Sequence, residues 1–127
     1  MEDIITVLKS LRVGFVIEEY ILQSQISNLL LSKNIAFFKE YVLGPRNRID
    51  FFIPQTTTLL EEKGVGIEVK KGKPNAQRLL QQLTRYAQFD VIQGLIVVTE
   101  RPVTIPTEIE GKPIELVCLR KLWGESL

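Results

Sequence analysis

Three residues whose side chains can do chemistry stand inside two apolar segments of this chain. The segment "IDFFI" carries Asp50, and the segment "GIEVK" carries Glu68 and Lys70. Apolar segments of this kind form buried strands, which normally exclude unpaired charges because their burial costs several kcal/mol. Two carboxylates that converge in such a place repel each other unless a cation lies between them. The sequence therefore predicts a cation site at Asp50 and Glu68.

The donor atoms narrow the identity of that cation. Carboxylate oxygens with few other donors suit Mg²⁺ or Mn²⁺, and both ions keep several water ligands in proteins. A lysine beside such an ion can position or help to deprotonate a water molecule, and it can stabilise charge on a phosphate. The alternative is an ordinary salt-bridge cluster at a sheet edge, because a Glu-x-Lys pair on a strand often arises by chance.

Strand geometry predicts that the three side chains meet. Side chains alternate across a strand, so Glu68 and Lys70 should share one face while Ile67 and Val69 share the other. Asp50 joins them if its strand pairs with the strand of Glu68 as a hairpin. The segment between the two strands is long enough for that connection.

Composition limits the possible functions. The 127 residues, 45% hydrophobic and 24% charged, are typical of a globular protein, and we expect residues 1–127 to form a single domain. The absence of histidine excludes His-based triads and HExxH zinc sites, and the one cysteine, Cys118, is expected in the core of a protein from a reducing compartment. The start "MEDIITVLKSLRVGF" is typical of neither a signal peptide nor a membrane span, so we expect a cytoplasmic location.

Positive charge is concentrated in one part of the sequence although the formal net charge is only +1. The segment from Val69 to Phe89 contains no acid, and its cations are Lys70, Lys71, Lys73, Arg78 and Arg85. Such a run is usually a solvated helix face. Beside a catalytic site it would instead form a phosphate-binding surface.

Hydrophobic periodicity predicts the elements that position these residues. We expect helices over 2–12, ending near Gly14, and over 16–33, followed by strands at 35–43, 48–53 and 65–70. A turn is expected at 44–47, a strand end at Pro54 and a polar loop at 55–64. Pro74 is positioned to open a third helix through Phe89. Its expected apolar stripe consists of Leu79, Leu80, Leu83, Tyr86 and Ala87.

Strands are also expected at 94–99, wholly apolar and therefore central, and at 113–119, before a short tail. The order of helix, three strands, helix and strand predicts an α/β sandwich with helices on both sides of a mixed sheet.

These residues resemble the PD-(D/E)XK nuclease superfamily, which has the restriction-endonuclease-like fold. The segment "RID" supplies Asp50, "IEVK" supplies Glu68 and Lys70, and the resemblance covers about residues 16–99. It implies an α-β-β-β-α-β core in a three-layer sandwich, with Asp50 and Glu68 as metal ligands and Lys70 as a catalytic residue. The usual Pro before the Asp is Ile49 here, a change found in many branches of the superfamily.

The resemblance also implies an acid on the helix before the strands. The pattern of that helix fits "EYILQ" with Glu19 as a catalytic metal ligand, and Glu18 is the second candidate. Glu40 is expected to decorate an outer strand instead.

The segment "QLTRY" matches the QxxxY element of the recombination-nuclease branch. That match implies that Gln82 arranges the active site and that Tyr86 lies near DNA. Alternatively, Gln82 is an ordinary helix residue and Tyr86 belongs to the core. The remaining cations of the basic segment would contact phosphates. They are Lys71, Lys73, Arg78 and Arg85.

The sequence thus predicts a metal-dependent deoxyribonuclease that hydrolyses phosphodiester bonds with Mg²⁺, for which Mn²⁺ would substitute. DNA is the expected partner, and neither a membrane nor a nucleotide cofactor is expected. Small phage-type nucleases and Holliday-junction resolvases share this size; the first would work in the host cell cytoplasm, the second as a homodimer. Near-neutral charge argues mildly against a resolvase.

Two further functions compete with the nuclease. One is a non-catalytic DNA-binding subunit that kept the fold, which would be expected to lose an acid or the lysine, whereas all of them are present here. The second is an interaction domain with a surface ion cluster, for which the acids inside apolar strands would be a coincidence. A divalent metal bound between Asp50 and Glu68 would separate the nuclease from both.

Overall fold

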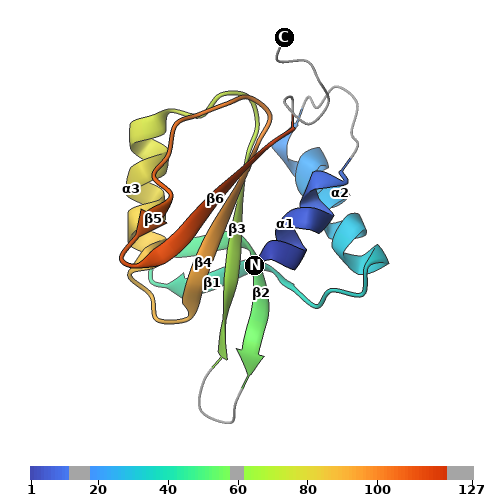
Figure 1. Cartoon of the computed structure of the whole chain (residues 1–127), viewed down its shortest axis with the longest axis horizontal. Helices are drawn as coiled ribbons and strands as arrows, with labels where there is room; N and C mark the ends of the chain where they lie inside the picture. Colours follow the sequence, from blue (N-terminus) through green and yellow to red (C-terminus); the bar gives the residue numbers. More distant parts are fainter. Residues whose placement is uncertain (12–17, 58–61, 120–127) are drawn as a thin grey trace.

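The computed structural model describes residues 1–11, 18–57 and 62–119. These residues form helices and strands that alternate along the chain (Figure 1). In chain order they are α1 (Glu2–Lys9), α2 (Glu19–Ser32), β1 (Phe38–Gly44), β2 (Asn47–Thr57), β3 (Glu62–Lys70), α3 (Ala76–Ala87), β4 (Ile92–Thr99), β5 (Glu108–Ile109) and β6 (Lys112–Cys118).

The strands build one mixed sheet in the order β1-β2-β3-β4-β6-β5. The pairs β1–β2, β2–β3 and β5–β6 are antiparallel, whereas β3–β4 and β4–β6 are parallel. A parallel pair needs a long crossover, and α3 provides it between β3 and β4. The expected mixed sheet is confirmed.

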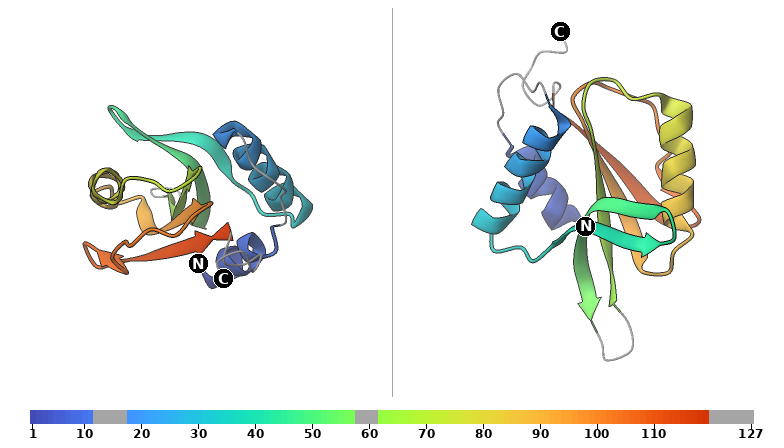
Figure 2. Two further views of the ribbon diagram at one scale, coloured as in Figure 1. Left: turned by 90° about the horizontal axis from the view of Figure 1, so that it is seen from above. Right: turned by 180° about the vertical axis from the view of Figure 1, so that it is seen from behind.

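Helices cover both faces of this sheet. Figures 1 and 2 show α1 and α2 on one side and α3 on the other. Each side has its own core. The α1/α2 side buries Leu8, Leu22, Ile26, Leu30, Phe51, Ile67 and Val69 among others. The α3 side buries Ile49, Phe52, Leu79, Leu83, Tyr86, Leu95 and Val97 among others. The expected α/β sandwich is therefore confirmed, with three layers.

Strand β2 runs on to Thr57, so the prediction that it closes at Pro54 is wrong. The pairing of β1 with β2 reaches only Phe52. Pro54 therefore has β3 alone as a neighbour, and the missing N–H of a proline is tolerated at such an edge. The opposite residue on β3 is Gly64, where a Cβ atom would collide with the Ile53 carbonyl oxygen. The expected loop shortens accordingly, and its part at 58–61 lies outside the described residues.

The start of α3 also differs from the prediction. Asn75 is the N-cap, and its side-chain oxygen accepts a hydrogen bond from the Arg78 N–H at 3.0 Å, so Pro74 precedes the helix. The helix ends at Ala87 rather than Phe89. Leu80 is 40% exposed and does not belong to the buried stripe.

Smaller differences concern the boundaries of further elements. Helix α1 ends at Lys9, and β1 begins at Phe38 and reaches Gly44. The short strand β5 was not predicted, because two residues carry no periodicity. The expectations for 12–17 and for the tail at 120–127 lie outside the described residues. Among the helices that the structure describes, none is long and apolar enough to cross a membrane.

Candidate active site

The candidate site lies where the pairing of β2 and β3 ends. The ladder runs from Thr57 opposite Glu62 to Phe51 opposite Ile67, and its next positions are Asp50 and Glu68. There the side chains replace the backbone as partners. Asp50 Oδ2 accepts a hydrogen bond from the Val69 N–H at 2.7 Å, and Glu68 Oε1 accepts one from the Asp50 N–H at 3.4 Å. Each carboxylate thus binds backbone of the opposite strand.

The direction of β2 side chains changes at the same point. Residues two apart on a strand normally share a face. Ile49, however, packs in the core on the α3 side and Phe51 in the core on the α1/α2 side. On β1, the position that falls opposite Asp50 in the register is Glu40, whose φ of 53° is unusual for a non-glycine residue. Asp50 therefore sits at a local irregularity shared by two strands, and the exposed Glu40 decorates the outer one, as expected.

Lys70 completes the group. Its Nζ atom lies 3.1 Å from Glu68 Oε2, and Lys70 is 27% exposed at the side chain whereas Glu68 is almost fully buried. Ile67 and Val69 belong to the core on the α1/α2 side. The predicted alternation and the predicted meeting of Asp50, Glu68 and Lys70 are confirmed.

Burial makes this pair of carboxyl groups hard to ionise. Burial, assisted by the negative charge of Asp50 and opposed by Lys70, raises the pKa of Glu68 to about 7. Burial likewise raises the pKa of Asp50; the hydrogen bond from Val69 opposes the shift and the charge of Glu19 adds to it. A bound cation would favour both ionised forms.

The donor atoms fit a hard divalent cation, with two carboxylates as ligands and water molecules in the remaining positions. Within residues 1–11, 18–57 and 62–119, however, no group of three or more His, Cys, Asp or Glu side chains is arranged to hold a metal ion. Glu19 is the first residue of α2, and its Oε1 accepts a hydrogen bond from the Lys71 N–H at 3.3 Å. It approaches Asp50 closely enough to raise its pKa without joining a cluster of three ligands.

The second helix acid is placed differently. Glu18 is the exposed N-cap residue of α2 and makes no side-chain capping hydrogen bond. Of the two acids, Glu19 is therefore the one oriented toward the end of β3.

Gln82 and Tyr86 form a chain of hydrogen bonds that connects α3 to β2. Gln82 Nε2 donates to the Tyr86 hydroxyl at 3.0 Å, and that hydroxyl donates to the Arg48 carbonyl oxygen at 2.9 Å. Tyr86 is only 3% exposed, and burial together with the nearby charge of Glu68 raises its pKa. The ring packs between α3 and the sheet, so the alternative expectation that Tyr86 belongs to the core is confirmed. Tyr86 also lines a cavity with Arg48 and Arg85, and its place near DNA stays a prediction.

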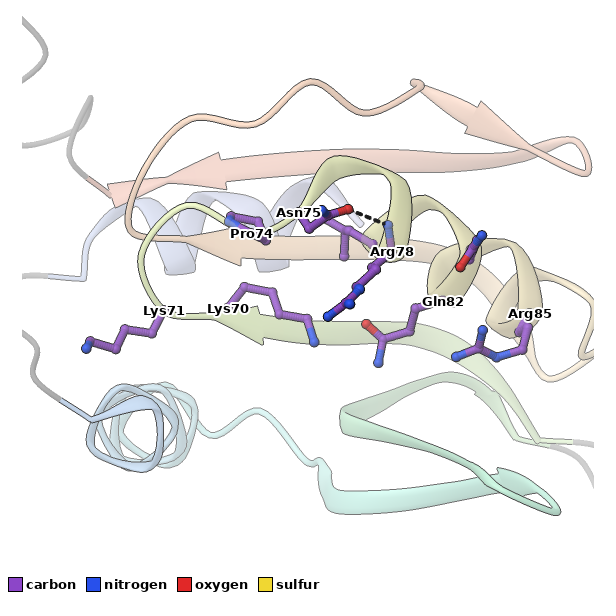
Figure 3. A pocket seen from close by; sticks show the side chains of 9 residues that line it. Lys70, Lys71, Pro74, Asn75, Arg78, Gln82 and Arg85 are labelled. Carbon is purple, nitrogen blue, oxygen red and sulfur yellow. Dashed lines mark hydrogen bonds between the residues drawn. The ribbon is translucent and has the colours of Figure 1, made fainter.

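The predicted phosphate contacts divide into two groups. Lys71, Arg78 and Arg85 line a cavity of about 580 Å³ together with Lys70 and Gln82. Figure 3 shows the side chains of Arg78 and Gln82 extending from α3 toward Lys70. Lys73 instead lines another cavity, formed by the start of α3 and the segment after β4.

Two arginines at the site were not predicted from the sequence. Arg46 and Arg48 line a further cavity of about 450 Å³, which also includes Gln82, Arg85 and Tyr86. The segment "GPRNR" shows both arginines, but only as part of a turn. Their place beside α3 depends on how that helix packs on β2.

Comparisons with protein-family models, with curated proteins and with solved structures gave no match for this chain.

The raised pKa of Glu68 predicts how stability depends on pH in the absence of divalent metal. A carboxyl group whose pKa rises from 4.5 to about 7 on folding binds more protons in the folded chain, so its contribution to stability is lost as the pH rises through that window. Glu68→Gln cannot ionise. Urea unfolding in EDTA should show this variant gaining stability relative to wild type between about pH 4.5 and 7.

The matched control is Glu115→Gln, which changes an exposed carboxylate on β6. It should follow wild type over the same range. Parallel pH profiles for wild type and Glu68→Gln would contradict the assignment.

Tyr86→Phe tests the structural role of that hydroxyl. The substitution leaves a part-buried hydrogen bond unmade and should lower the free energy of unfolding by about 1–2 kcal/mol. Tyr41→Phe removes a hydroxyl with only a long 3.5 Å contact to Glu62 and should change stability little. Chemical denaturation of both variants gives their free energies of unfolding. Equal losses would show that the hydrogen bond of Tyr86 to the Arg48 carbonyl oxygen does not contribute to stability.

Proposed function

We propose that this protein is a metal-dependent deoxyribonuclease of the PD-(D/E)XK type, with the restriction-endonuclease-like fold. The observation that carries the proposal is the placement of a buried carboxylate, Glu68, and a half-buried one, Asp50, at the end of the β2–β3 ladder, with the Lys70 ammonium 3.1 Å from Glu68. A salt bridge that only stabilises the fold would need a single acid beside Lys70. The second carboxyl group adds a desolvation cost, because the pKa values of both Asp50 and Glu68 are raised. The order α2, β1, β2, β3, α3, β4 supports the resemblance in fold.

The carboxylates of Asp50 and Glu68 would hold Mg²⁺ or Mn²⁺. When bound there, the ion supplies positive charge for phosphoryl oxygens and lowers the pKa of water. The Val69 N–H orients Asp50, and the Lys70 ammonium together with the Asp50 N–H orients Glu68. Glu19 adds negative charge at the end of β3, where it would strengthen the attraction for a divalent cation.

Lys70 is the group that would act on the phosphate. It is partly exposed beside the buried Glu68, so its ammonium can hold a water molecule or a phosphoryl oxygen at the edge of the site. Gln82 lines the same cavity as Lys70, and Tyr86 holds its amide through a hydrogen bond. Gln82 is therefore proposed as a positioning residue.

Cleavage of DNA with Mg²⁺ under single-turnover conditions tests the role of Lys70 against its neighbour Lys71. Lys70→Ala should slow cleavage by about 10²–10³, the usual loss when a positioned charge-stabilising group is removed. Lys71→Ala keeps the backbone N–H that binds Glu19 and should reduce only salt-dependent affinity. Loss of cleavage in Lys71→Ala alone would reverse the assignment.

Isothermal titration calorimetry of Mg²⁺ binding tests the role of Asp50 as a metal ligand. Asp50→Asn keeps an acceptor for the Val69 N–H but loses the charge, so it should bind Mg²⁺ far more weakly than wild type. Equal binding by both proteins, or absence of cleavage of linear, single-stranded, flapped and four-way DNA, would refute the proposal. Cleavage confined to four-way DNA by a dimer would identify a resolvase. DNA binding without hydrolysis would identify a non-catalytic subunit.

A second comparison concerns the helix acids. Glu19→Gln should impair cleavage while leaving DNA affinity nearly intact, because Glu19 faces the end of β3. Glu18→Gln carries the same charge change at an exposed N-cap and should have little effect. The reverse ranking in single-turnover assays would assign the role to Glu18.

A further inference from the structure

Two neighbouring cavities lie along α3 and have lining residues in common. The first is lined by Lys70, Lys71 and Arg78, the second by Arg46 and Arg48, and both share Gln82 and Arg85. We call the two cavities together, defined by those residues, the α3 groove. Figure 3 shows the lining of the first cavity, beside the end of β3, and the second cavity includes residues of the turn between β1 and β2.

The groove is strongly cationic. Its lysines and arginines face no acid among the residues that line either cavity. Among the residues that the structure describes, Lys70 is the groove cation that forms an ion pair, and its partner is Glu68. Arginines that line a hollow without carboxylate partners raise the local concentration of a polyanion. Their planar forks also match phosphate oxygens.

The spacing on α3 suits a ligand that runs along the helix. Arg78, Gln82 and Arg85 stand at i, i+4 and i+7, which places them on one stripe of the helix. Arg78 and Arg85 are two turns apart, about 10.5 Å along the axis. The adjacent stripe, with Leu83 and Tyr86, is buried against the sheet, so α3 is held while its groove side stays accessible.

The dimensions favour one strand over two. The hydrogen bond of 2.9 Å from the Tyr86 hydroxyl to the Arg48 carbonyl oxygen joins α3 to β2 between two residues that line the second cavity. The cavities of about 580 and 450 Å³ are in the size range of sites for single small molecules. Hollows of this size suit one nucleotide unit each, and this match favours a single strand as the ligand.

We propose that the α3 groove binds a single DNA strand through its phosphates and guides it to Lys70, Asp50 and Glu68. The preferred substrate class is then DNA with a single-stranded segment, such as an overhang or a flap, rather than blunt duplex. The identity of the ligand as DNA rests on the proposed function. The backbone contacts carry no sequence code, so little base preference is expected.

Fluorescence anisotropy in EDTA tests the groove without hydrolysis. Single-stranded DNA and a duplex with a single-stranded arm should bind at least about tenfold more tightly than blunt duplex of the same length, because blunt duplex cannot reach all the groove cations. Arg48→Ala, Arg78→Ala and Arg85→Ala should each weaken binding of the single strand. Each should also reduce the slope of log affinity against log salt by about 0.7.

Lys73→Ala is the matched control. It removes the same charge from an exposed residue near the start of α3 that lines a different cavity, and its salt slope should equal that of wild type. Blunt duplex bound as tightly as the single strand would overturn the inference. So would an effect of Lys73→Ala equal to those of the groove variants.

A separate cleavage assay with Mg²⁺ distinguishes the two proposals. Cleavage with a preference for blunt duplex would leave the nuclease standing and remove the groove proposal. Selective single-strand binding that depends on the groove arginines, without hydrolysis, would leave the groove standing and remove the nuclease. Absence of DNA binding would remove both.

Discussion

The exchange of hydrogen bonds between Asp50, Glu68 and the backbone of the opposite strands is the interaction on which the site depends. Two carboxylates can stay inside a sheet only if their desolvation is offset, and the N–H groups of Val69 and Asp50 together with the Lys70 ammonium supply that offset. The offset is incomplete, because both carboxyl groups keep raised pKa values. The remaining electrostatic cost is what a divalent cation would relieve.

The same constraint explains the backbone around the site. Replacing ladder hydrogen bonds by side-chain hydrogen bonds ends the pairing of β2 with β3 at Phe51 and changes the facing of β2 between Ile49 and Phe51. The positive φ of Glu40 on β1 lies opposite this point. Strain of this kind persists only where the surrounding structure enforces it.

Helix α3 connects the site to the surface that would hold a substrate. One stripe of the helix packs on the sheet and is tied to β2 through Tyr86 and the Arg48 carbonyl oxygen. The neighbouring stripe carries Arg78, Gln82 and Arg85 along the groove. Because α3 packs on the sheet, the position of its cations relative to Lys70 on β3 is fixed, as the proposed delivery of a phosphate would require.

The sequence by itself determined the order of the main elements and the shared face of Glu68 and Lys70, whereas the pairing of β2 with β3 that brings Asp50 to them was a condition that the structure fulfils. These properties follow from periodicity within a strand or helix, which is local. Only the tertiary structure decided that Tyr86 is buried, that Lys73 lies apart, and that Arg46 and Arg48 stand beside Arg85. The burial of Tyr86 and the position of the two arginines depend on how α3 packs against β2, and the place of Lys73 depends on how the start of α3 meets the segment after β4. All of these are contacts between segments far apart in the chain. The extension of β2 past Pro54 also depends on a contact between strands. The proline is tolerated there because β1 does not pair with β2 beyond Phe52.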